Sequence, residues 1–126
     1  MAKILVIDDA PNVRSSLNML LRKKGYDVLL ADNGWNGLEL YRQEHPDAIL
    51  LDLRMPGLDG IEVLKEIRSG DLKQPVIILT GDTNPETEQE VRALGVSEFI
   101  RKGLSLQALT DALEHLWEDP TRRMET

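Results

Sequence analysis

Short apolar runs alternate with longer amphipathic segments along the whole chain. The runs are continuous and rich in branched residues, which is typical of strands that are covered on both faces in a parallel sheet. Strands are predicted at residues 4–7, 28–30, 49–51 and 76–79, with a weaker fifth at Phe99 and Ile100. Strand and helix thus alternate roughly five times. This pattern predicts an α/β fold, a doubly wound five-stranded parallel sheet with helices on both faces.

Polar residues and glycines mark the predicted helix ends. Asp59 lies three residues before Glu62, the spacing of a capping box, and Asn84 precedes a proline in the manner of an N-cap. Leu104 and Leu109 have the spacing of a hydrophobic staple that opens the last helix. The glycines expected at helix C-termini are Gly25, Gly70 and Gly95. These signals support the alternation of strand and helix.

The length of 126 residues suits a single domain. We expect that domain to span residues 1–119 and residues 120–126 to fray, because the apolar period is lost after Trp117. No apolar run approaches the length of a membrane span, and the N-terminus lacks the features of a secretion signal, so we expect no membrane association. The absence of cysteine excludes disulfides and thiolate metal sites and fits a reducing cytoplasm.

The formal net charge of −7 weighs against direct nucleic-acid binding, because phosphate backbones attract basic surfaces. Proteins and cations are the expected partners. Candidate cation ligands lie at the carboxyl ends of two predicted strands, where open parallel sheets bind ligands. Asp8 and Asp9 follow the first strand and Asp52 follows the third, and a lone carboxylate that ends an apolar run is costly to bury without compensation.

In the flavodoxin-like strand order 2-1-3-4-5, the first and third strands are neighbours, so the three carboxylates would converge. Such a cluster takes up protons or recruits a hard cation, and oxygen-only ligands favour Mg²⁺. Thr80 and Lys102 follow the fourth and fifth strands and can donate to an anion held by the metal. A phosphoryl group is the natural anion, because carboxylates can accept phosphoryl groups. This interpretation makes Asp52 the nucleophile, with Asp8 and Asp9 holding Mg²⁺.

Each of these residues also has a purely structural interpretation. Asp8 and Asp9 could equally cap the first helix. Thr80 could be a turn residue at the end of a strand, and Lys102 could be a solvated surface charge. Taken together, however, the side chains at the strand ends are all of the types that phosphoryl transfer needs, which favours a site.

The strings ILVIDD, ILLDLRMPGLDG, VIILTGD and EFIRKG follow one another at separations that resemble the receiver domain of bacterial two-component response regulators, over nearly the whole chain. The resemblance implies transfer of a phosphoryl group to Asp52 from a sensor histidine kinase or a histidine phosphotransfer protein. It implies the Arg54 backbone carbonyl as a further metal ligand. It also implies a switch, in which Thr80 moves toward the phosphoryl group and Phe99 turns inward.

The family resemblance further implies that the surface of the fourth helix, fifth strand and fifth helix changes for a downstream effector. A homodimer formed on phosphorylation is an additional expected state. Receivers catalyse their own Mg²⁺-dependent phosphorylation and dephosphorylation, but they are switches more than enzymes. A cytoplasmic location is expected with this function.

The sequence departs from the family pattern after Lys102, where Gly103 replaces the usual proline that is joined by a cis peptide. A cis bond costs ~2.5 to 4 kcal/mol before a non-proline residue and about 0.5 to 1 kcal/mol before proline, so we expect a trans or mobile loop. Phe99 also lacks the hydroxyl of a tyrosine. Arg54 and Asp82 resemble the variable positions that tune dephosphorylation, and their opposite charges predict an ion pair that shields the acyl phosphate from water.

Three other functions compete with this interpretation. A phosphatase with an aspartate nucleophile would have two aspartates separated by one residue after the first strand, whereas IDDAP has them adjacent. Nucleotide or flavin binding would require a glycine- or hydroxyl-rich phosphate loop, whereas DDAPN is acidic. A receiver-like binding module that is never phosphorylated stays open because of Gly103.

Overall fold

The computed structural model describes residues 2–82, 84–103 and 106–118. Five strands form one parallel sheet in the order β2-β1-β3-β4-β5, as predicted. The strands are β1 (Lys3–Ile7), β2 (Asp27–Ala31), β3 (Ala48–Leu51), β4 (Val76–Thr80) and β5 (Glu98–Arg101). The helices are α1 (Pro11–Lys23), α2 (Gly34–Glu44), α3 (Gly60–Gly70), α4 (Pro85–Leu94) and α5 (Leu106–Glu118).

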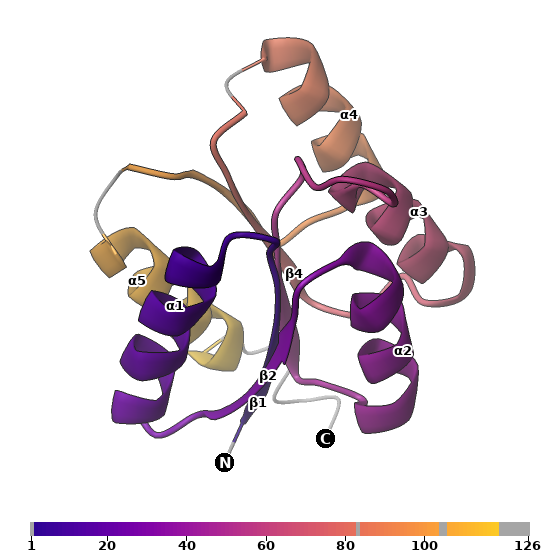
Figure 1. Cartoon of the computed structure of the whole chain (residues 1–126). Coiled ribbons are helices and arrows are strands. Elements are labelled where there is room, and N and C mark those ends of the chain that lie inside the picture. Colours follow the sequence, from indigo (N-terminus) through magenta and orange to yellow (C-terminus); the bar gives the residue numbers. More distant parts are fainter. Residues whose placement is uncertain (1, 83, 104–105, 119–126) are drawn as a thin grey trace.

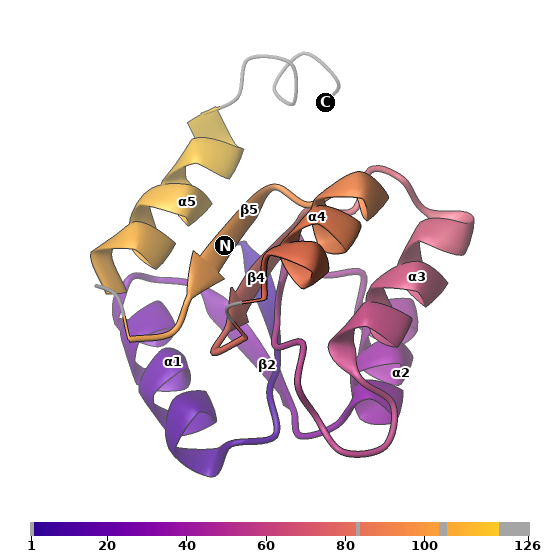
Figure 2. The same cartoon turned by 90° about the horizontal axis from the view of Figure 1, so that it is seen from above.

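The helices cover both faces of the sheet, with α1 and α5 on one face and α2, α3 and α4 on the other (Figures 1 and 2). Alternate residues of each central strand therefore enter two separate cores. Ile4 and Val6 of β1 pack toward α1 and α5, whereas Leu5 and Ile7 pack toward the opposite helices. Because helices cover both faces of the sheet, the sequence of each central strand is a continuous run of apolar residues.

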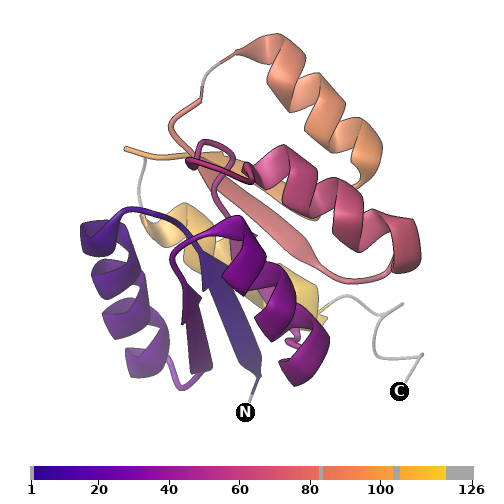
Figure 3. The same cartoon turned by 45° about the vertical axis from the view of Figure 1, so that its right-hand side comes forward.

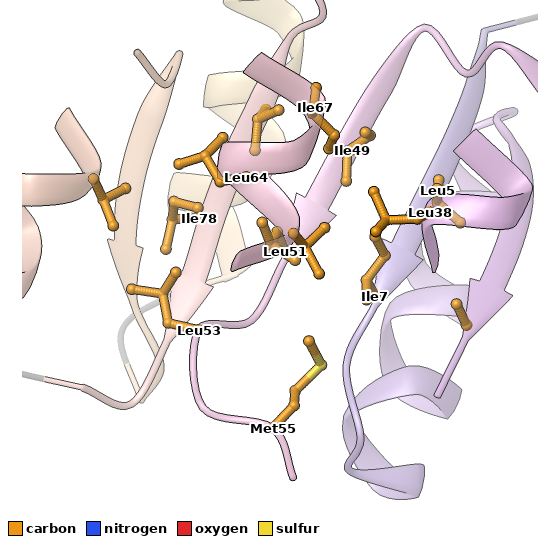
Figure 4. Packing of buried hydrophobic residues seen from close by; sticks show 14 of the residues in the cluster. Leu5, Ile7, Leu38, Ile49, Leu51, Leu53, Met55, Leu64, Ile67 and Ile78 are labelled. Carbon is orange, nitrogen blue, oxygen red and sulfur yellow. The ribbon is translucent and has the colours of Figure 1, made fainter. Parts of the chain in front are cut away.

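The larger core lies between the sheet and the layer of α2, α3 and α4, whose three helices are seen side by side in Figure 3. Figure 4 shows Ile49, Leu51 and Ile78 of the sheet facing Leu64 and Ile67 of α3. These side chains are buried almost completely. The core fixes the central strands rigidly and thereby fixes the loops that leave their carboxyl ends.

The predicted helix caps at Asp59 and Asn84 are confirmed. The Asp59 carboxylate accepts a hydrogen bond of 3.0 Å from the Glu62 N–H, and the Asn84 side chain accepts one of 2.9 Å from the Glu86 N–H. Gly95 ends α4 with a φ of 99°.

Gly25 also has a positive φ, whereas Gly70 is itself the last residue of α3. The staple predicted around Leu104 and the tail at residues 120–126 lie outside the described residues. In the described part of the chain, no helix has both the length and the apolar character of a membrane span.

Candidate functional site

Three carboxylates meet where β1 and β3 end side by side. Ile7 pairs with Leu51 in the sheet, and the Asp52 N–H donates a 3.0 Å hydrogen bond to the Ile7 carbonyl. Oxygens of Asp8, Asp9 and Asp52 consequently lie within 4.8 Å of one another. The convergence expected from the strand order is confirmed.

Asp8 and Asp52 are only 2% and 4% exposed, whereas Asp9 is half-buried. Burial raises the pKa of Asp52 above its ordinary value, and the neighbouring charge of Asp8 raises it further. Lys102 opposes both effects by favouring the ionised carboxylate. The site thus concentrates negative charge on carboxylates of which two are almost completely buried.

Asp8 does not cap the first helix. The N-cap of α1 is Ala10, for which no side-chain cap hydrogen bond is present, and Asp8 Oδ1 instead accepts a 2.9 Å hydrogen bond from the Ala10 N–H. The Arg14 guanidinium donates a 2.8 Å hydrogen bond to the Asp8 carbonyl. The alternative prediction, that the side chains of Asp8 and Asp9 cap α1, is therefore wrong.

Lys102 reaches the carboxylates from the end of β5. Its Nζ lies 2.9 Å from Asp8 Oδ2 and 3.2 Å from Asp52 Oδ2, which excludes the alternative of a solvated surface charge. Burial lowers the pKa of Lys102, but the hydrogen bond to Asp8 and the charges of both carboxylates outweigh it, so the net pKa is raised. Lys102 is therefore a cation held inside the acidic cluster.

Thr80 ends β4 and is fully buried. Its hydroxyl oxygen accepts a 3.2 Å hydrogen bond from the Asp82 N–H, and its carbonyl accepts a 2.7 Å hydrogen bond from the Lys102 N–H. The second bond ties the ends of β4 and β5 together. The structure thus places Thr80 beside the chain segments that carry Asp82 and Lys102.

An open hollow of about 510 Å³ lies over the cluster. Its lining residues are Asp9, Asp52, Arg54, Gly81, Asp82 and Lys102. The acidic cluster is thus open to solvent on one side, and Arg54 and Asp82 lie at the edge of this opening.

The ion pair predicted between Arg54 and Asp82 is present. Arg54 Nη2 and Nε lie 2.6 Å and 2.8 Å from Asp82 Oδ2. The backbone N–H of Asn84 lowers the pKa of Asp82 most strongly, and Arg54 lowers it further. Arg54 itself is 63% exposed, whereas the Asp82 side chain is 8% exposed.

The loop after Lys102 follows the trans alternative, because none of the described peptide bonds is cis, and Gly103 has a φ of 92°. A positive φ strains any residue with a Cβ, so glycine suits this position. Phe99 is buried, and the guanidinium carbons of Arg92 and Arg101 each lie 5.8 Å from its ring centroid. The Phe99 ring is thus buried and has a guanidinium group near it from each of α4 and β5.

Gly60 is a site-supporting residue that sequence reasoning missed. A Cβ at this position would overlap the carbonyl of Asp52 and crowd Leu53. The Gly60 N–H donates a 3.0 Å hydrogen bond to the Leu53 carbonyl, so the start of α3 packs directly on the loop that carries Asp52. A glycine directly after the Asp59 cap was the available signal, because glycine is a poor helix former.

The donor set fits a hard divalent cation. Asp8, Asp9 and Asp52 offer only oxygen atoms, and their charges exceed that of the single Lys102 that pairs with two of them. Few carboxylates together with access to water are characteristic of Mg²⁺ sites. The cluster could therefore hold a metal ion.

Comparisons with known proteins agree with this geometry. Residues 4–114 match the model of the response regulator receiver domain. The chain is 37% identical over 112 residues to sporulation initiation phosphotransferase F of Bacillus subtilis, which covers 89% of this chain and 90% of that protein. It is 38% identical over 107 residues to regulatory protein AtoC of Escherichia coli, but that match spans 85% of this chain and only 23% of AtoC.

Solved structures show the same fold. A response regulator receiver domain protein from Clostridium thermocellum superposes with a TM-score of 0.91 at 30% identity, covering 100% of both chains. Chemotaxis protein CheY4 of Vibrio cholerae gives a TM-score of 0.84 at 31% identity and covers 92% of this chain.

Proposed function

Because the chain belongs to the response regulator receiver domain family, whose members are phosphoryl-accepting signalling switches, we propose that Asp52 is its phosphoryl acceptor. The single observation that carries the proposal is the position of Asp52, which directly follows β3 inside an acidic cluster, lines the hollow and contacts Lys102. Asp8 is a poorer candidate, because it does not line the hollow, whereas Asp52 does. The family assignment decides against the phosphatase and nucleotide-binding alternatives.

In the proposed reaction, an Asp52 carboxylate oxygen attacks the phosphorus of a phosphohistidine on the donor protein. The P–N bond breaks and its electron pair returns to the imidazole, so the phosphoryl group passes to Asp52 as an acyl phosphate. Mg²⁺, when bound, supplies positive charge to the phosphoryl oxygens, and Asp8, Asp9, Asp52 and the Arg54 carbonyl would hold it. In dephosphorylation, water attacks the phosphorus and the P–O bond to Asp52 breaks.

Lys102 and Thr80 would bind the transferred group. The Lys102 Nζ is already 3.2 Å from Asp52 Oδ2. After transfer, a small movement would let the ammonium group bind a phosphoryl oxygen on Asp52. The Thr80 hydroxyl accepts from the Asp82 N–H, which leaves its own proton free for donation. We further propose that the Arg54 side chain at the rim of the hollow, which pairs with Asp82 before phosphorylation, shields the acyl phosphate from water.

The switch and its partners belong to the same proposal. Receiver domains interact with histidine kinases and effectors. For this chain we propose a sensor histidine kinase or histidine phosphotransfer protein as donor and the surface of α4, β5 and α5 as the effector face. Thr80 and Phe99 would carry the change to that face, and a homodimer would be one output. A cytoplasmic location is part of this proposal.

The test is incubation with Mg²⁺ and acetyl phosphate, followed by mass measurement of the intact protein. The wild type should gain one phosphoryl group, and Asp52→Asn should gain none. Asp27→Asn, which changes an exposed aspartate at the start of β2, is the matched control and should be phosphorylated like the wild type. A wild type that gains no mass would favour the receiver-like module that is never phosphorylated.

A further inference from the structure

Asp82 connects the rim of the hollow to the beginning of α4. One carboxylate oxygen, Oδ2, accepts the 2.8 Å hydrogen bond from Arg54 Nε and lies 2.6 Å from Arg54 Nη2. The other oxygen, Oδ1, accepts a 2.9 Å hydrogen bond from the Asn84 N–H. The same carboxylate therefore binds a residue of the β3–α3 loop and the N-cap residue of α4.

The connection continues into the helix. The Asn84 side chain accepts a 2.9 Å hydrogen bond from the Glu86 N–H, and the Asn84 carbonyl accepts a 3.2 Å hydrogen bond from the Glu88 N–H. Asp82 thus positions the residue that supplies the first polar contacts of α4. A shift of the Asp82 carboxylate would therefore move Asn84 and disturb the hydrogen bonds that these backbone N–H groups donate.

Outside its own helix, the first turn of α4 is anchored by Asp82, by the buried Thr87 and by an ion pair of 2.8 Å between Glu88 and Arg101 of β5. Asn84, Pro85 and Glu86 are exposed, and Thr87 is the one buried side chain between residues 84 and 88. Thr87 itself hydrogen-bonds the Asp82 carboxylate, so Asp82 contacts the first turn at two residues. The later part of α4 is anchored separately, because the side chain of Val91 is buried in the core. The first turn should consequently have a low free energy of local opening, to which one polar contact makes a measurable difference.

Arg54 lines the same hollow as Asp52, so its guanidinium has two possible anionic partners once Asp52 carries a phosphoryl group. A phosphoryl group carries more negative charge than a carboxylate, and one guanidinium group can donate two parallel hydrogen bonds to two phosphoryl oxygens. The phosphoryl group should therefore compete effectively with Asp82 for Arg54. Because Arg54 is 63% exposed, its side chain is free to move.

We propose that the Arg54–Asp82 ion pair is a latch that holds the first turn of α4, and that phosphorylation of Asp52 opens it by drawing Arg54 away. The second half rests on the proposed function. The first half concerns the unphosphorylated protein and stands independently of it. The latch would couple phosphorylation of Asp52 to a structural change at the start of α4, which is one end of the proposed effector face.

The test is hydrogen exchange measured by mass spectrometry on the peptide that contains residues 84–88. In the unphosphorylated protein, Arg54→Gln should speed exchange of these amides roughly twofold to fivefold, the range that corresponds to loss of an exposed ion pair. Arg42→Gln is the matched control. Arg42 is 58% exposed and pairs with Glu66 at 3.2 Å between α2 and α3, away from the hollow, so its loss should leave the peptide unchanged.

Phosphorylation with acetyl phosphate and Mg²⁺ should produce the same increase in the wild type and little further increase in Arg54→Gln. Unchanged exchange in unphosphorylated Arg54→Gln would overturn the latch, whatever happens to Asp52. Normal phosphorylation of the wild type without faster exchange would overturn its opening by the phosphoryl group. Failure to gain mass, with faster exchange in Arg54→Gln, would leave the latch standing and refute the proposed function instead.

Discussion

Replacing Asp52 by asparagine should stabilise the protein in the absence of divalent metal. Asp52 lies within 4.8 Å of two other carboxylates and 3.2 Å from one ammonium group. At an effective dielectric constant of about 20, each repulsion costs roughly 3.5 kcal/mol and the attraction returns roughly 5 kcal/mol. The net cost of the Asp52 charge is therefore about 2 kcal/mol, before its burial is counted.

The pH dependence of this effect follows from the raised pKa of Asp52, whose ordinary value is 3.8. Because the folded state disfavours the charged form, ionisation of Asp52 costs stability as the pH rises from the ordinary value through the raised value. Below the ordinary value the carboxyl is protonated in both the folded and unfolded states, and the cost vanishes. Asp52→Asn should thus gain about 2 kcal/mol at pH 7 and almost nothing near pH 3.

Thermal or urea unfolding in a chelating buffer at low ionic strength measures this gain. For a chain of this size, about 2 kcal/mol raises Tm by roughly 5 to 10 °C. Asp27→Asn should change little, because that side chain is exposed. Adding Mg²⁺ should stabilise the wild type more than Asp52→Asn. If Asp52→Asn were no more stable than the wild type at pH 7 without metal, the reasoning from carboxylate repulsion would be refuted.

Three further predictions concern the surroundings of Asp52. Lys102→Met should destabilise the metal-free protein by about 3 to 5 kcal/mol, because it leaves the buried Asp8 unpaired, and Mg²⁺ should restore much of this loss in urea titrations. Gly60→Ala should cost about 2 kcal/mol or more because its Cβ overlaps backbone, whereas Gly70→Ala, whose Cβ meets nothing within 4 Å, should be neutral or slightly stabilising in the same assay. Arg54→Gln should shorten the lifetime of the acyl phosphate severalfold, as followed by loss of phosphoryl mass after removal of the donor, and an unchanged lifetime would contradict the shielding role.

The sequence determined the strands and the positions of the acidic residues at their ends. Continuous branched apolar runs form buried parallel strands whatever lies between them, because both faces of each strand must be covered. Asp8 and Asp52 follow such runs directly, so their placement at one edge of the sheet followed once the two strands were neighbours. The caps at Asp59 and Asn84 could also be predicted, because capping depends on residues two or three positions apart.

Only the tertiary structure decided which side chains meet across the loops. The sequence left open whether Lys102 is a solvated surface charge, and its pairing with Asp8 answers this, although the two residues are far apart in the chain. The need for glycine at Gly60 appears only when α3 packs on the loop after β3. Likewise, opposite charges suggested the Arg54–Asp82 pair, but not that the Asp82 carboxylate also binds α4. Local patterns set strands and caps through short-range sterics and burial, whereas these contacts depend on where the packed cores place the ends of separate elements.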